Sequence, residues 1–151
     1  LKPLQLEDRA EIFYEFLSVL SKKHNIDHVY IEEPFTMFGG GRTTAGTMAK
    51  LQRFNGMCSF AVRRIFKTNP VLIPANKARK SVGLKIKRGE DTKKKIIEWV
   101  ETKYPKDFVY ELTSYGNPKP GTDDKADAVV IALAGLSEIN SSLDLDQLNQ
   151  A

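Results

Sequence analysis

The chain has 151 residues, 41% of them hydrophobic and 28% charged, a composition typical of a globular protein large enough to bury a core. Its formal net charge of +4 and its pI near 9.1 favour an acidic partner such as nucleic acid. One cysteine and two histidines exclude an internal disulfide and a His/Cys metal site, and no apolar run reaches the ~20 residues of a membrane span, so we expect an intracellular protein, cytoplasmic or nucleoid-associated.

In the first half of the chain, amphipathic helices alternate with short apolar strands. Residues 5–23 predict a helix, "HVYIE" (28–32) predicts a strand that Pro34 ends, and residues 36–43 predict a loop with three successive glycines. A long helix follows at about 44–67, and "PVLIP" predicts a second short buried strand. The inner stripe expected for the long helix is Leu51, Phe54, Cys58, Ala61, Val62 and Ile65.

The second half is strongly basic before it becomes helical. Residues 76–95 hold nine Lys or Arg against two acids, and a helix is predicted from about Thr92 to Lys103. "FVYEL" fits a short strand or an extended helix end, and "YGNPKPG" predicts a turn-rich loop. "TDDKADAVVIALAGL" predicts a helix whose nearly all-apolar body is buried, followed by a polar tail over residues 140–151.

Strands separated by helices predict an α/β domain over residues 1–139. Two strands are too few for a stable α/β sheet, because most sheets have about 4 to 6. The chain also begins with Leu1 rather than Met. We therefore expect the first strands of this domain to lie before Leu1.

Carboxylates occupy two positions suited to chemistry. Glu32 and Glu33 stand at a strand tip, where alternation sends them to opposite faces, so one of them can face a site across the sheet end. Asp124 and Asp127, three apart on a helix, share a face, with Asp123 beside them. Both groups also fit simpler roles, namely a solvated strand end and a capped helix start.

If these carboxylates converge, they predict a hard divalent cation, Mg²⁺ or Mn²⁺, because no His or Cys ligand accompanies them. Two such ions would activate a water and stabilise the leaving oxygen in phosphodiester cleavage. No organic cofactor is expected, since the chain has neither G-x-G-x-x-G nor a lysine-bearing P-loop.

Two further segments suggest contact with nucleic acid. Lys77, Arg79 and Lys80 follow a strand, and Lys93 and Lys94 begin a helix, which favours a phosphate footprint over a merely solvated loop. In "PFTMFGGGR", glycines allow close backbone approach and aromatics can stack on bases, although the two phenylalanines could equally fold onto the core.

Three segments together resemble the RuvC-like Holliday-junction resolvases of the RNase H-like nuclease superfamily. They are "VYIEEPF" at a strand end, the helix containing "AKLQRFNG", and "DDKADAVVIALA" near the C-terminus. The resemblance extends from the first helix to about Leu136. It implies an RNase H-like mixed sheet flanked by helices, and a homodimer that cuts four-way double-stranded DNA junctions by paired nicks.

The resemblance also implies roles for individual residues. Glu32, Asp124 and Asp127 would hold Mg²⁺ together with an aspartate upstream of Leu1, and Phe35 would stack at the junction. Lys93 would be catalytic, binding or polarising the scissile phosphate, and Lys80 is the second candidate for that role. The further DNA contacts expected are Arg42, Lys77, Arg79, Lys80 and Lys94.

Two features depart from the family pattern: the family's first aspartate-bearing strand is missing, and the triple glycine after Phe38 is unusual. Alternatives therefore remain open. They are another RNase H-like nuclease acting on flaps, forks or RNA–DNA hybrids, a non-catalytic DNA-binding module, and, with least support, a small-molecule α/β enzyme.

Overall fold

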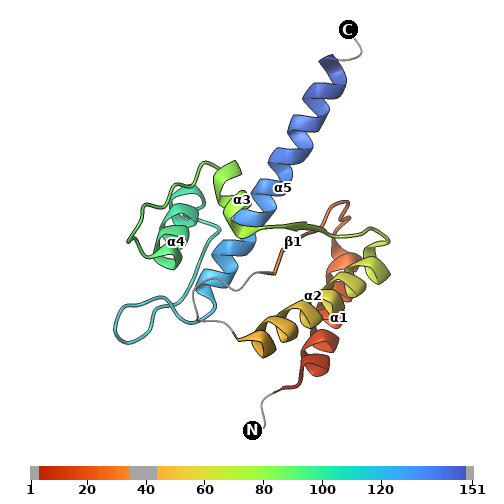
Figure 1. The fold of residues 1–151 in the computed structure, drawn as a ribbon, viewed down its shortest axis with the longest axis horizontal. Helices are drawn as coiled ribbons and strands as arrows, with labels where there is room; N and C mark the ends of the chain where they lie inside the picture. Colours follow the sequence, from red (N-terminus) through yellow and green to blue (C-terminus); the bar gives the residue numbers. More distant parts are fainter. Residues whose placement is uncertain (1–3, 35–43, 149–151) are drawn as a thin grey trace. The chain divides into compact units, whose positions relative to one another are not determined.

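The computed structural model describes residues 4–34 and 44–148, with the side chains of residues 142–148 left out of the description. Over these ranges the chain is mixed α/β, with five helices and one two-stranded parallel sheet (Figure 1). It divides into two compact units, Leu1–Pro74 and Ala75–Ala151.

The first unit is built from a helix and a strand–helix–strand motif. Helix α1 (Leu6–Lys23) packs against α2 (Ala45–Phe66), and α2 connects strand β1 (Tyr30–Glu32) to the parallel strand β2 (Val71–Ile73). In the register Tyr30 faces Val71 and Glu32 faces Ile73. The core of this unit is formed by Leu17, Ala61 and Val62, with Phe13, Leu20, Val29, Ile31, Ile65 and Phe66 packed around them.

The second unit consists of three helices. Both α3 (Ala75–Ser81) and α4 (Thr92–Lys103) pack against α5 (Thr122–Leu148). Apolar side chains of α4 and α5 are buried in this unit: Ile96, Ile97, Val100, Ala126, Val130, Ile131 and Ala134. The spacing of these residues, one, three or four apart along each helix, gives each helix one inward stripe.

Local chemistry explains where the helices begin. The Gln5 backbone N–H donates to the Asp8 carboxylate at 3.0 Å at the start of α1. The Asp91 carboxylate caps α4 by accepting from the backbone N–H groups of Lys93 and Lys94 at 3.0 and 3.2 Å. Such caps satisfy donors that have no partner inside the helix.

The predicted helices at 5–23, 44–67 and 92–103 are confirmed within a residue or two, as are both strands. The predicted burial is wrong at three residues. In β2, Val71 and Leu72 are 46% and 42% exposed, and in α2 Leu51 is 50% exposed. Hydrophobicity alone does not show which of several apolar faces is covered.

Three further differences concern the second unit. Helix α3 lies within the basic stretch, where no helix was predicted, and α5 continues through residues 140–148 of the expected polar tail. The body of α5 is not buried all round, since Leu136 is 51% exposed. The segment "FVYEL" is neither a strand nor a helix end, and contributes only an isolated bridge between Leu112 and Pro118.

Candidate functional site

Three carboxylates project from the first two turns of α5. The buried Thr122 hydroxyl donates to the Lys119 carbonyl at 2.7 Å, which fastens the preceding loop to the start of the helix. The side chains of Asp123 and Asp127 are 18% and 24% exposed, whereas Asp124 is exposed. The carboxylates are thus held at the surface by a fixed helix start.

Lys93, in the first turn of α4, forms an ion pair with Asp123. The hydrogen bond and charge of Asp123 raise the pKa of Lys93, and the charges of Asp124 and Asp127 raise it further. The same hydrogen bond lowers the pKa of Asp123. The three carboxylates in the first two turns of α5 therefore all act on one ammonium group.

Arg79, on α3, reaches the same set of carboxylates from another helix. Its guanidinium donates to Asp127 at 3.2 Å, and both side chains are 24% exposed. The Nε of Arg79 is buried and has no hydrogen-bond partner among the described residues. An unpaired buried donor is costly, so the contact with Asp127 leaves the Arg79 guanidinium incompletely hydrogen-bonded within the described residues.

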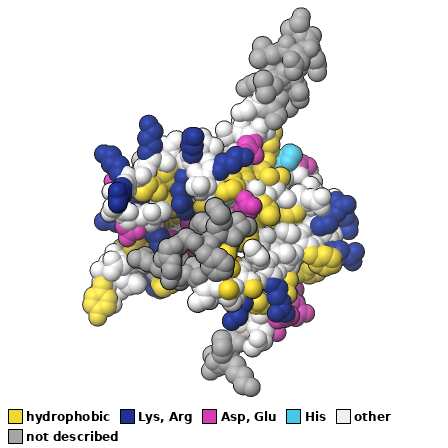
Figure 2. Space-filling view, viewed as in Figure 1, with side chains coloured by type: hydrophobic (Ala, Val, Ile, Leu, Met, Phe, Trp, Pro, Cys, Tyr) yellow, Lys and Arg dark blue, Asp and Glu magenta, His cyan; other side chains and the backbone are white. Residues whose placement is uncertain are grey.

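A basic groove of about 650 Å³ lies along the segment from α3 to the start of α4. Its lining includes five cations, Arg79, Lys80, Lys85, Lys87 and Arg88. Figure 2 shows Lys and Arg side chains gathered over this part of the second unit. Arg79 lines the groove and also contacts Asp127, so this one side chain links the groove to the start of α5, whose carboxylates do not themselves line the groove.

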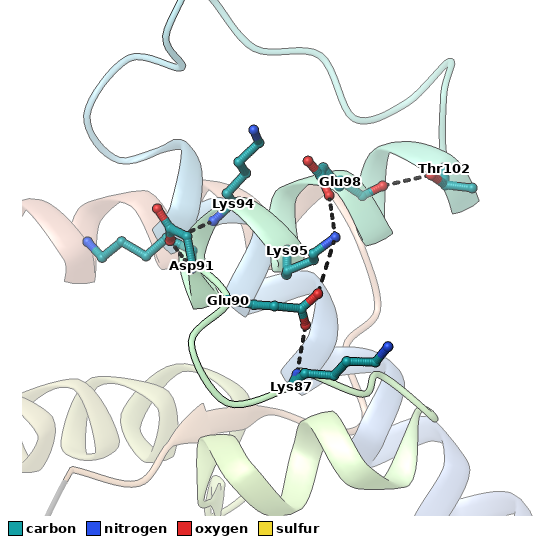
Figure 3. A network of polar contacts seen from close by, with 8 residues as sticks. Lys87, Glu90, Asp91, Lys94, Lys95, Glu98 and Thr102 are labelled. Atoms are coloured by element: carbon teal, nitrogen blue, oxygen red, sulfur yellow. Dashed lines mark hydrogen bonds and ion pairs between the residues drawn. The ribbon is translucent and has the colours of Figure 1, made fainter.

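The acids near this groove are engaged in local contacts. Glu90 accepts from the Lys87 backbone N–H at 2.7 Å and lies 3.8 Å from the Lys95 ammonium, which also contacts Glu98 at 3.3 Å. Figure 3 shows the Lys87 and Lys94 ammonium groups extending away from the contacts of this network. Glu90 therefore orders the segment while the Lys87 and Lys94 ammonium groups stay available to a ligand.

A second cleft, of about 610 Å³, is lined by α4 and by the loop that precedes α5. Lys93, Lys94 and Asp123 all contribute to its lining. Lys77 lines neither cleft and instead pairs with Glu138 at 2.7 Å. The predicted cations thus lie in three places. Arg79 and Lys80 line the basic groove, Lys93 and Lys94 line the second cleft, and Lys77 pairs with Glu138 of α5.

Glu32 belongs to the first unit and ends β1 with an exposed side chain. Its backbone carbonyl accepts from the Asn55 side-chain amide of α2 at 3.1 Å. The backbone N–H of Glu33 continues the strand pairing by donating to the Ile73 carbonyl at 3.0 Å. The strand tip is therefore well defined, and Glu33 is the more covered of the two glutamates.

Within the ranges that the structure describes, no three His, Cys, Asp or Glu side chains form a group that could hold a metal ion. The oxygen-only donors at the start of α5 nevertheless suit a hard divalent cation. The ligands predicted from the sequence are Glu32, Asp124 and Asp127, and that assignment stays a prediction. Phe35 and Arg42, predicted to contact DNA, lie outside the described residues.

Several site residues were not singled out from the sequence. Asp123, considered only as a neighbour of the D-x-x-D pair, is the one that contacts Lys93. Lys85, Lys87 and Arg88 belong to the basic stretch, but nothing in their local pattern indicates a groove. Only the packing of α3 and α4 on α5 brings these groups together.

Comparison with protein-family models, with curated proteins and with solved structures finds no match. In the part of the chain that the structure describes, no helix combines the length and the apolar character needed to cross a membrane.

Proposed function

We propose that this chain is a metal-dependent, structure-selective endonuclease that cuts branched DNA, with four-way junctions as its substrate. The observation that supports this most directly is Arg79, which lines a groove of five cations and also contacts the Asp127 carboxylate. A phosphate backbone bound in that groove would lie next to carboxylates suited to metal binding. The resemblance to RuvC-like resolvases supplies the choice of substrate, the homodimer and the RNase H-like fold.

Asp124 and Asp127 are the proposed metal ligands of the second unit. They stand three apart on α5, which places both on one side of the helix. The resemblance assigns Glu32 to the same metal, and that role is a prediction of its own. A bound Mg²⁺ would supply charge neutralisation and activation of a water.

The cations have separate tasks in this proposal. Lys80 and the other groove residues collect the DNA backbone, and their contacts fix its register without reading sequence. Lys93 and Arg79 hold charged donors beside the carboxylates, where negative charge develops during phosphodiester cleavage. Phe35 is proposed to stack at the junction.

The test is the substitution Asp127→Asn. We expect it to abolish Mg²⁺-dependent nicking of a four-way junction and to leave junction binding in Ca²⁺ or EDTA largely intact, because all five cations of the groove are retained. Asp107→Asn is a matched control, since Asp107 is exposed in the same unit and lines neither cleft. Nicking by Asp127→Asn at the wild-type rate would exclude the metal assignment.

A second candidate, a non-catalytic DNA-binding module, is favoured by the ion pairs themselves. Lys93 and Arg79 already neutralise Asp123 and Asp127, an arrangement that could serve structure alone. Under this alternative the wild-type protein binds junctions but does not nick them in Mg²⁺ or Mn²⁺. Symmetric cuts across the junction would identify a resolvase, and cuts only in flaps, forks or RNA–DNA hybrids would identify another nuclease of the superfamily.

A further inference from the structure

The segment before α5 forms a small closed hairpin over residues 111–119. The Lys119 backbone N–H donates to the Glu111 carbonyl at 2.9 Å, and the Thr113 N–H donates to the Asn117 carbonyl at 2.7 Å. An antiparallel bridge joins Leu112 to Pro118 between these bonds. Backbone hydrogen bonds therefore hold this loop in a defined conformation, and it projects away from the helices of its unit in Figure 1.

The tip of this hairpin presents an aromatic ring. The Gly116 N–H donates to the Thr113 carbonyl at 2.9 Å, and Gly116 has a φ of 76°, a conformation that favours glycine. This turn leaves Tyr115 90% exposed, the highest exposure among the large hydrophobic residues of the described chain. A single exposed apolar side chain is ordinary, so the surroundings of Tyr115 decide what its exposure means.

The hairpin that carries Tyr115 forms part of the wall of the second cleft. The hairpin contributes Leu112, Gly116, Asn117, Pro118 and Lys119 to its lining, and α4 contributes Lys93 and Lys94. The Asp123 carboxylate lines the same cleft. Gly116, the residue next to Tyr115, therefore borders the same cleft as Lys93 and Asp123.

The cleft also contains acids, and each has a partner. Asp91 accepts from the two N–H groups that it caps, and Glu98 contacts Lys95. Glu101 accepts from the Tyr110 hydroxyl at 3.2 Å. Lys94 is exposed, with its ammonium group turned away from these contacts. A phosphate at the rim would thus meet the Lys94 ammonium with its nearest acids already engaged.

We propose that the 111–119 hairpin is a stacking element, in which Tyr115 packs against an unpaired base while Lys94 and Lys93 contact the neighbouring phosphates. This inference rests on the proposed function and narrows its substrate class. The substrate would be a nucleic acid that has an unstacked base next to the phosphate bound near the carboxylates of α5. Aromatic side chains suit such a role because every base offers a flat face.

The experiment compares wild type, Tyr115→Ala and Tyr115→Trp. It measures their binding to a four-way junction and to a single-stranded oligonucleotide carrying 2-aminopurine, in Ca²⁺ so that no cleavage occurs. We expect Tyr115→Ala to weaken single-strand binding about 5- to 150-fold and to lose the change in 2-aminopurine fluorescence, with both restored by Trp. The salt slope of binding should stay unchanged, since tyrosine carries no charge. Blunt duplex binding should not change.

The control is Phe16→Ala, an aromatic residue of the first unit that is 61% exposed and lines no part of this cleft. Wild-type affinity and fluorescence in Tyr115→Ala, or equal losses on blunt duplex, would overturn the stacking role while nicking by wild type still supports the nuclease. Base stacking without any nicking would reject the nuclease and keep the stacking element. A wild-type protein that binds no nucleic acid would reject both.

Discussion

At the residue scale, Lys93 is the group on which the charges of the site converge. One ammonium faces Asp123 directly and also feels Asp124 and Asp127. The ion pair spans two helices and involves a largely exposed lysine, 76% accessible, so solvent screens it. The strength of the Lys93–Asp123 ion pair is therefore better measured from the pKa of Asp123 than from the free energy of unfolding.

Replacing Lys93 by Met is expected to raise the pKa of Asp123 toward its ordinary value, because the hydrogen bond that lowers it is lost. In wild type, the stabilisation from Asp123 is present above its unfolded pKa of about 3.9 and is lost as the pH falls through its lower folded pKa. Lys93 has a raised pKa, so its stabilisation is present below about 10.4 and is lost as the pH rises through the folded value. Carboxyl NMR titration of both proteins measures the change.

The matched control for that titration is Lys106→Met, an exposed lysine of the same unit that lines neither cleft. Asp123 should titrate as in wild type in this variant. An Asp123 pKa that is equal in wild type and in Lys93→Met would show that Lys93 does not contact the carboxylate in solution.

At the element scale, the start of α4 positions both Lys93 and Lys94. The Asp91 cap fixes the first turn through two backbone contacts. The apolar stripe of Ile96, Ile97 and Val100 then fixes the rotation of the helix, because these side chains are buried. Cap and stripe together determine that the two lysines face the cleft.

Asp91→Ala is expected to lower the free energy of unfolding by about 0.5–2 kcal/mol, the usual cost of losing an N-cap. Asp91→Ser should retain most of the stability, since a serine hydroxyl can accept the same N–H bonds. Urea denaturation followed by circular dichroism measures both. An alanine variant as stable as the serine variant would mean that the cap does not stabilise α4.

At the scale of the whole molecule, the positively charged side chains are unevenly distributed along the chain. The net charge is only +4, yet the groove of the second unit gathers five cations with one acid in its lining, Glu90. Electrostatic binding depends on such local density more than on the net charge. DNA affinity should therefore respond to groove residues and not to lysines elsewhere.

We expect Lys87→Ala and Arg88→Ala each to reduce the slope of log affinity against log salt by about 1, because each removes one of the phosphate contacts that the proposed function assigns to the groove. Junction binding in EDTA at several salt concentrations measures the slope. Lys22→Ala, an exposed lysine of α1 in the first unit, is the control and should leave the slope unchanged. Equal slopes in all four proteins would place the phosphate contacts outside this groove.

The sequence by itself determined the helices α1, α2 and α4, the start of α5 and the two strands. The physical reason is that apolar periodicity, prolines and capping groups act over a few neighbouring residues. The same local signals did not predict α3, because its short, basic sequence carries little apolar pattern.

Only the tertiary structure decided which charged groups meet. Arg79 and Asp127 are 48 positions apart and come together because α3 packs on α5, and Lys93 reaches Asp123 because α4 does the same. The sequence predicted Asp124, Asp127 and Lys93 as site residues without their partners. Pairing across helices depends on packing between distant segments, and no local spacing specifies it.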